Sequence, residues 1–193
     1  MFRAGVLALA LAACRSEPRT LGNPASAMPE HWIGPKVEVR GPTAAKATLI
    51  RFWTDGCPHC RVSLPAIAAL REEFHERGLE TIAIYHTRQP RPPDPAEVEA
   101  IARGLGYAGP LAADLDWRTL SAAGLGDRTR KMTSATFLLD HDGKVRFTHP
   151  GPEIHPSSDP DHLTCQGAFE SLRSCVQELL GEPNAKQADL GTP

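Results

Sequence analysis

The sequence has no excess of charge of either sign and no long hydrophobic run apart from a short one at its N-terminus. The net charge of the 193 residues is −2 at pH 7. Without a basic field the chain has no electrostatic means of attracting nucleic acid, so we expect no nucleic-acid partner. Apolar residues make up 41% and charged residues 23% of the chain, which excludes a wholly disordered protein.

The apolar run at the N-terminus is too short to span a bilayer, but it ends at a cysteine. Arg3 precedes an apolar stretch over residues 6–13, and Cys14 follows Leu11-Ala12-Ala13. This pattern resembles a bacterial lipoprotein signal, in which a Leu and two small residues precede the cysteine that carries the lipid. The resemblance implies a signal peptide over residues 1–13 and a lipid anchor on Cys14, at the periplasmic face of a membrane. The alternatives are a plain secretory signal with an incidental cysteine and a buried helix.

The rest of the chain divides by composition into three parts. Residues 14–35 are rich in Pro, Gly, Ser and charge, which predicts a flexible tether. An ordered N-terminal arm, which packing of Trp32 and Ile33 would support, is the alternative. Residues 36–181 then form the predicted domain, and residues 182–193 a disordered tail.

The domain alternates predicted strands and helices before it ends in a β-hairpin and a last helix. This order predicts an α/β fold with a mixed central sheet and helices on both faces. Periodicity and turn residues predict strands at 37–39, 48–53, 79–85, 111–115, 135–139 and 145–148, helices at 57–77, 95–105, 117–123 and 169–180, and a Pro-rich loop over 149–167.

A pair of cysteines at the start of the first predicted helix carries the chemistry. Cys57-Pro58-His59-Cys60 follows a strand, and two thiols at this spacing lie within one helical turn, where they can close a disulfide ring. The helix start stabilises a thiolate, so we expect Cys57 to be the nucleophile and Cys60 the resolving thiol. Pro58 suits the first helical position, and His59, when charged, adds to the stabilisation of the thiolate. Both residues therefore tune the reduction potential.

Two stretches of the sequence carry a family resemblance. Residues 51–65 look like the active-site strand and helix of thioredoxin-like proteins, and residues 135–145 are similar to the hairpin of the TlpA-like, redoxin-type periplasmic branch. The resemblance implies a three-layer thioredoxin-like fold and a thiol–disulfide oxidoreductase that needs no cofactor. It also implies extracytoplasmic protein thiols or disulfides as substrates and a membrane redox partner.

Several positions depart from the family pattern. The Pro-His pair matches strongly oxidising relatives, whereas many TlpA-like proteins are reductants, so the direction of electron flow stays open. Arg51 stands where thioredoxins have a buried carboxylate. Thr133-Ser134 occupies the place of the family's cis-proline, with Ser134 at the proline position. Since a cis bond without proline costs about 3–4 kcal/mol, we expect a trans bond and a more open substrate groove.

A thiol peroxidase is one alternative function. Thr54 precedes Cys57 at the spacing that peroxiredoxins use. Ile50 and Ser134 stand where peroxiredoxins carry a proline and an arginine, so Arg128 or Arg130 would have to substitute. A structural zinc site is disfavoured because the chain has no second C-x-x-C pair.

The two remaining cysteines leave a disulfide open. Ten residues of continuous helix span about 15 Å, far beyond what a disulfide allows. A Cys165–Cys175 bond therefore requires Cys165 to lie in a loop that folds back along the helix. The alternative is that Cys175 is a small buried apolar residue.

Histidines gather in the Pro-rich loop around Cys165. His149, His155 and His162 make this loop a candidate metal site, for copper above all, and a copper-handling module is the second alternative function. Their irregular spacing and the abundant proline favour a solvated loop, so we predict no metal here.

Overall fold

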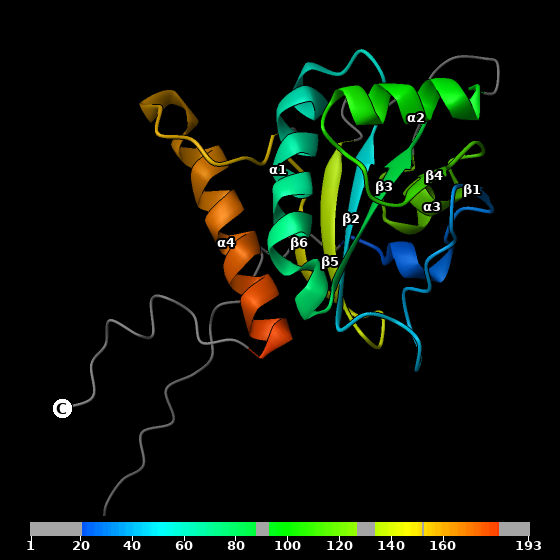
Figure 1. The fold of residues 1–193 in the computed structure, drawn as a ribbon, viewed down its shortest axis with the longest axis horizontal. Helices are drawn as coiled ribbons and strands as arrows, with labels where there is room; N and C mark the ends of the chain where they lie inside the picture. The colour runs from blue at the N-terminus through cyan, green and yellow to red at the C-terminus, as the bar shows by residue number, and fades with distance from the viewer. Residues whose placement is uncertain (1–20, 88–92, 127–133, 152, 182–193) are drawn as a thin grey trace, which may run out of the picture.

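The computed structural model describes residues 21–87, 93–126, 134–151 and 153–181, which form a sheet covered by helices (Figure 1). The sheet order is β1-β4-β3-β2-β5-β6. Strands β2, β3 and β4 are parallel, whereas β1, β5 and β6 run antiparallel to their neighbours. The strands are β1 (His31–Ile33), β2 (Ala47–Trp53), β3 (Leu79–Tyr85), β4 (Leu111–Ala113), β5 (Ala135–Asp140) and β6 (Val145–His149).

Helices cover both faces of this sheet. Helices α1, α2 and α4 contribute to the hydrophobic core on one face, and α3 with the short helix η1 contributes to the core on the other. The predicted α/β fold with helices on both faces is thus confirmed. The helices are α1 (Pro58–Phe74), α2 (Pro95–Gly104), α3 (Arg118–Ala122) and α4 (Leu163–Leu180), with 3-10 turns η1 (Pro24–Ser26), η2 (His75–Arg77) and η3 (Pro160–His162).

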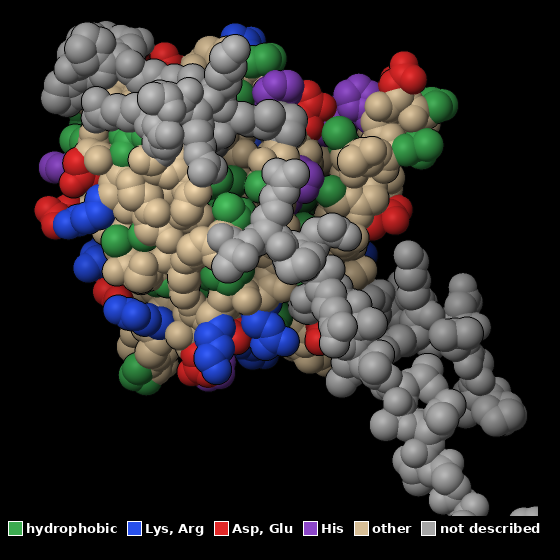
Figure 2. All heavy atoms as spheres, turned by 180° about the vertical axis from the view of Figure 1, so that it is seen from behind, with side chains coloured by type: hydrophobic (Ala, Val, Ile, Leu, Met, Phe, Trp, Pro, Cys, Tyr) green, Lys and Arg blue, Asp and Glu red, His purple; other side chains and the backbone are tan. Residues whose placement is uncertain are grey.

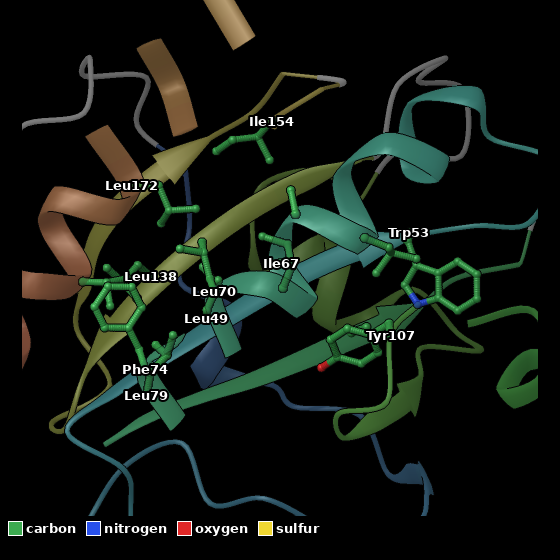
Figure 3. Close-up of a cluster of buried hydrophobic side chains, with 14 of the residues drawn as sticks. Leu49, Trp53, Ile67, Leu70, Phe74, Leu79, Tyr107, Leu138, Ile154 and Leu172 are labelled. Atoms are coloured by element: carbon green, nitrogen blue, oxygen red, sulfur yellow. The ribbon is translucent and has the colours of Figure 1, made fainter. Parts of the chain in front are cut away.

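Strand β2 forms the centre of the molecule because every one of its seven residues is buried. Side chains alternate across a strand, so Leu49 and Trp53 face α1 while Ile50 and Phe52 face the opposite core. Figure 3 shows Leu70 of α1 beside Leu49, with Leu172 of α4 above them. This packing fixes α1, and with it the C-P-H-C motif, over the carboxyl end of β2.

The N-terminal segment belongs to the fold, so the predicted flexible tether is wrong for residues 21–35. Strand β1 pairs with β4, and Ala25 is 5% exposed. The backbone amide of Gly22 donates to the Ala123 carbonyl at 3.2 Å. The strand predicted at 37–39 is absent from the described sheet, although Val39 is buried. Cys14 and the rest of the predicted signal lie outside the described residues.

Helix α4 begins at Leu163 rather than at residue 169, so the long loop predicted up to residue 167 is wrong from Pro160 onward. The carboxylate of Asp159 accepts a hydrogen bond from the Asp161 amide at 3.0 Å and starts η3, which leads directly into α4. Gly181 ends α4 with φ of +77°, a left-handed conformation that glycine adopts without steric cost.

The early start of α4 excludes the Cys165–Cys175 disulfide. Both residues lie in the same continuous helix, about 15 Å apart along its axis, and Cys165 is a free thiol. The backbone does not fold back, which was the condition for the bond. Cys175 is fully buried in the core beside α1.

Charges of both signs share the molecular surface. On the described part of the face in Figure 2, basic and acidic side chains lie intermingled along the edges. Exposed ion pairs among the described residues include Arg173 with Glu73 and Arg103 with Glu99. This distribution agrees with the small net charge of the sequence.

Candidate active site

A short loop between β2 and α1 presents the cysteine motif. Gly56 has φ of +67°, a left-handed conformation in which a residue with a side chain would be strained. The Tyr85 hydroxyl donates to the Asp55 carboxylate at 2.6 Å, and the Thr54 hydroxyl donates to the same oxygen at 3.2 Å. Burial, followed by the Asp55 carboxylate, raises the pKa of Tyr85 to about 12. The loop is therefore tied to β3 directly before Cys57.

The two thiols differ in exposure. Cys57 is the N-cap of α1 in an extended conformation, and Pro58 occupies the first helical position, where a missing N–H leaves no bond unmade. Cys57 is half-buried, whereas Cys60 is only 1% exposed. The Cys60 amide donates to the Cys57 carbonyl at 3.1 Å, which closes the first turn. This is the arrangement expected of an accessible sulfur and a shielded partner.

Ser134 contacts both sulfurs. Its Oγ lies 3.4 Å from Cys57 Sγ and 3.2 Å from Cys60 Sγ. Antiparallel pairing of β5 with β2 places Ser134, just before β5, opposite the end of β2. Ser134, which the sequence analysis set at the position of the family's cis-proline, thus lies beside the two thiols. Thr133 lies outside the described residues, so the expected trans bond between the two stays a prediction.

The surroundings separate the acidities of the two thiols. Burial acts to raise the pKa of Cys57, but hydrogen bonds from the Cys60 thiol, the Ser134 hydroxyl and the amides of Cys60 and His59 outweigh it and lower this pKa. Deeper burial raises the pKa of Cys60, although the positive charge of Arg51 opposes the rise. Cys57 is thus the thiol that ionises first.

Arg51 is a buried cation beneath the motif. It is 0% exposed, and its Nη1 donates to Thr136 Oγ1 at 3.0 Å. Burial lowers the pKa of Arg51, and the cysteine sulfurs, Cys60 first and then Cys57, act in the opposite direction. The alternation of β2 places Arg51 on the same face as Leu49 and Trp53, so the sequence pattern already aims it at α1. A cation therefore replaces the carboxylate of thioredoxins and favours negative sulfur.

His59 of the motif is joined to a residue that the sequence analysis missed. Its Nδ1 lies 2.7 Å from Oε1 of Glu153, which follows β6 in the chain. The hydrogen bond with His59 lowers the pKa of Glu153 against partial desolvation. No local motif marks Glu153, because 94 residues separate it from His59.

The structure brings together only some of the histidines named as metal candidates. His155, His162 and Cys165 gather around Glu153, and the donor atoms of these four residues lie within 4.8 Å of one another. His149 is turned away, because its Nε2 pairs with the backbone oxygen of Glu153 at 2.8 Å. Burial lowers the pKa of His149. The expected solvated loop is thus an ordered cluster at the start of α4.

The peroxidase features find little support in the geometry. The Thr54 hydroxyl is used by Asp55 rather than by Cys57. Arg128 and Arg130 lie outside the described residues. The cation that acts on the described thiols is Arg51, from the strand beneath them.

Comparison with known proteins identifies the family of the chain. The Redoxin family model matches residues 24–163. The thiol-disulfide oxidoreductase YkuV of Bacillus subtilis is 22% identical over 120 residues, which are 62% of this chain and 77% of YkuV. The thiol-disulfide oxidoreductase ResA of Halalkalibacterium halodurans is 25% identical over 122 residues, which are 63% of each chain. The match therefore spans less than two thirds of that ResA.

A solved structure supports the fold. A crystal structure described as a putative thiol:disulfide interchange protein DsbE from Chlorobium tepidum superposes with a TM-score of 0.52 at 19% identity, over 72% of this chain and 82% of the other. The thioredoxin-like α/β fold that the sequence predicts is confirmed, and so is the enzyme class, a thioredoxin-like thiol–disulfide oxidoreductase.

Proposed function

The chain belongs to the Redoxin family, and from this membership we propose that it exchanges disulfides with extracytoplasmic proteins through Cys57 and Cys60. The observation that carries the proposal is the asymmetry of the two thiols. Cys57 is half-exposed with a lowered pKa, and Cys60 is buried with a raised one. An exposed thiolate attacks a partner, and a shielded thiol completes the exchange.

The first step uses the thiolate of Cys57. Its sulfur attacks one sulfur of a substrate disulfide, the substrate S–S bond breaks, and one substrate sulfur leaves as a thiolate that takes up a proton. A mixed disulfide between Cys57 and the substrate remains. Hydrogen bonds from Ser134 and from the amides at the start of α1 stabilise the attacking thiolate before the reaction.

The second step uses Cys60 after loss of its proton. Its sulfur attacks Cys57 Sγ, the mixed disulfide breaks, and the second substrate thiolate leaves. The substrate gains two electrons and the protein is left with a Cys57–Cys60 disulfide. Burial opposes ionisation of Cys60, and the charge of Arg51, followed by a hydrogen bond from Ser134, favours the attacking form. The same steps in reverse oxidise a substrate dithiol.

The direction of exchange follows from which form of the pair is more stable. A lowered Cys57 pKa and a buried cation both stabilise reduced, negatively charged sulfur, and so raise the reduction potential. We therefore expect a potential above that of thioredoxin, which is about −270 mV. Equilibration with glutathione buffers measures it, and a value at or below thioredoxin's identifies a reductant instead.

Trapping of the mixed disulfide tests the mechanism. The Cys60→Ser variant is expected to accumulate a covalent complex with substrate protein through Cys57, because no second thiol resolves it. Cys57→Ser is the matched control and should trap nothing. A complex that forms equally in both variants excludes the proposed roles.

A peroxide assay separates the oxidoreductase from the thiol peroxidase. A peroxidase keeps consuming hydrogen peroxide with an external thiol donor after loss of Cys60, whereas disulfide exchange needs both thiols. We expect Cys60→Ser to show no peroxidase turnover. Sustained turnover in this variant would replace the proposed function by a peroxidase.

The lipoprotein-like N-terminus supports placing the protein at the periplasmic face of a bacterial membrane, anchored through Cys14. Among the described helices, none is both long and apolar enough to cross a membrane. A signal over residues 1–13 would leave Cys14 as the lipidated residue, with a membrane redox partner within reach. Incorporation of labelled palmitate into the wild-type chain, and none into Cys14→Ala, is the expected result; an unlabelled wild-type chain excludes the anchor.

A further inference from the structure

A second group of chemically active side chains lies next to the thiol site and takes no part in disulfide exchange. Glu153 and His155 come from the segment after β6, and His162 and Cys165 come from the start of α4. His162 is the N-cap of α4 and Cys165 follows three positions later, a spacing that places both side chains on one face of the helix.

The three distances from one Glu153 oxygen are those of neighbouring ligands around a single ion, and all donor atoms of the cluster lie within 4.8 Å of one another. Oε2 of Glu153 lies 3.5 Å from His155 Nε2, 3.6 Å from His162 Nδ1 and 3.7 Å from Cys165 Sγ. Zinc binds O, N and S donors at about 2.0–2.3 Å, so the edges of a tetrahedral zinc site measure about 3.3–3.8 Å. The three separations already match such edges.

One buried donor in the cluster makes no hydrogen bond to any of the described residues. It is Nε2 of His155, whose partner there is Oε2 of Glu153 at the longer distance of 3.5 Å. Leaving a buried ring nitrogen without a hydrogen bond is costly. The rings of His155 and His162 also lie with their centroids 5.1 Å apart, and their donor nitrogens are within 4.8 Å of each other.

Glu153 has one oxygen for each neighbouring site. Its Oε1 is paired with Nδ1 of His59, whereas Oε2 faces His155, His162 and Cys165. Binding of an ion through Oε2 alone therefore leaves the contact with the C-P-H-C motif in place. Carboxylates that bind a metal are usually oriented by a hydrogen bond to their other oxygen, and His59 makes such a bond here.

We propose that Glu153, His155, His162 and Cys165 form a binding site for one divalent cation of borderline softness, with Zn²⁺ as the ion that fits best. Two imidazoles, one thiolate and one carboxylate are donors that zinc accepts, and four protein ligands describe a closed, structural type of site. Hard cations such as Mg²⁺ prefer oxygen ligands and do not match this set. The ion would join the segment after β6 to the first turn of α4.

Zinc titration of the full chain tests the proposal once competition from the active-site thiols is removed. In the Cys57→Ser/Cys60→Ser background, calorimetry with excess Mg²⁺ and a non-chelating reductant is expected to show one Zn²⁺ per chain. In that background Cys165→Ser and His162→Ala should each weaken binding on the order of 100-fold or more, since loss of an outer partner alone costs about 10–100-fold. His141→Ala, an exposed histidine outside the cluster, is the matched control and should bind as before.

Two further measurements identify the ligands. Co²⁺ in place of Zn²⁺ should give a thiolate-to-cobalt charge-transfer band that is lost in Cys165→Ser and kept in His141→Ala. Saturating Zn²⁺ should also protect Cys165 from N-ethylmaleimide without any substitution in the cluster, and EDTA should remove the protection. Absence of Zn²⁺ binding, affinity unchanged by both cluster substitutions, or an unprotected Cys165 would each overturn the proposal.

Discussion

Cys57 and Cys165 occupy similar places in the backbone and have opposite acidities. Cys57 is the N-cap of α1, Cys165 is the third residue of α4, and both are half-buried free thiols. A helix N-terminus favours a thiolate through its free amides and its dipole. Nevertheless the pKa of Cys57 is lowered, and the pKa of Cys165 is raised by desolvation and by the Glu153 carboxylate.

The difference lies in what stands beside each sulfur. Ser134 and two backbone amides donate to Cys57, and Arg51 adds a positive charge nearby. Cys165 has the carboxylate of Glu153 at 3.7 Å, which accepts its S–H and repels a thiolate. A helix start therefore does not by itself make a reactive cysteine. The surroundings of Cys57 favour disulfide exchange with proteins. The surroundings of Cys165 favour binding of a cation, which would neutralise the Glu153 carboxylate.

The largest expected contrast is in turnover. Cys57→Ser should reduce the rate of insulin disulfide reduction, with dithiothreitol as the donor, to the uncatalysed background, because no attacking sulfur remains. Cys165→Ser should keep most of the rate, since the Cys165 thiol is hydrogen-bonded to Glu153 and not to a residue of the C-P-H-C motif. Equal losses in the two variants would contradict the separation of the two thiols.

The pH dependence of alkylation comes next. In chelator, the rate of iodoacetamide modification at each peptide, followed by mass spectrometry, reports its thiolate. Because the pKa of Cys57 is lowered, its rate should reach half-maximum below the ordinary cysteine value of about 8.5. The raised pKa of Cys165 should place its midpoint above that value. Equal midpoints for the two cysteines would contradict the predicted difference in their acidities.

Removal of the Ser134 hydroxyl should reduce the difference between the pKa values of Cys57 and Cys165. Ser134→Ala deletes a hydrogen bond to Cys57, so the pKa of Cys57 should rise. Alkylation of Cys57 near pH 7 should slow by about 2- to 10-fold, the range of one net hydrogen bond. Ser134→Thr keeps the hydroxyl and serves as the control. A rate in Ser134→Ala equal to wild type would mean that the amides alone stabilise the thiolate.

The smallest effect is expected on the other thiol. Glu153→Gln removes the negative charge beside Cys165, so its pKa should fall toward the ordinary value. With chelator present, alkylation of Cys165 near pH 7 should become about 2- to 5-fold faster, a small effect because solvent screens a charge near the surface. Glu170→Gln is the matched control, because Glu170 lies in α4 with Cys165 but is hydrogen-bonded to Gln166. No change in Glu153→Gln would assign the raised pKa to burial alone.

Patterns in the sequence were sufficient for the centre of the fold but not for its margins. Strand β3 is found at the predicted residues, because residues 82–85 form the continuous apolar run typical of a buried parallel strand. Strand β1 has three residues and owes its existence to pairing with β4, which no local pattern indicates. The start of α4 was missed because Gly167 lies within its first turns and interrupts the apolar period.

The site divides in the same way. Cys57 and Cys60 are marked by their spacing and by the strand before them, and the helical position of each follows from that alone. Glu153 is a single carboxylate in a segment without periodicity, and its two sets of partners come from different helices. The position of Glu153 depends on tertiary packing, so the residues next to it in the sequence do not predict its role.

The packed segment from Leu21 to Ala25 limits the length of free chain between a lipid on Cys14 and the domain. A free chain over residues 14–35 would let the domain range up to about 75 Å from a lipid on Cys14. Gly22 and Ala25 are instead held against the folded body, so an anchor at Cys14 would leave at most about 25 Å of extended chain. Under the proposed anchor, the domain would stay within about its own diameter of the bilayer, and its substrates would have to come to that surface.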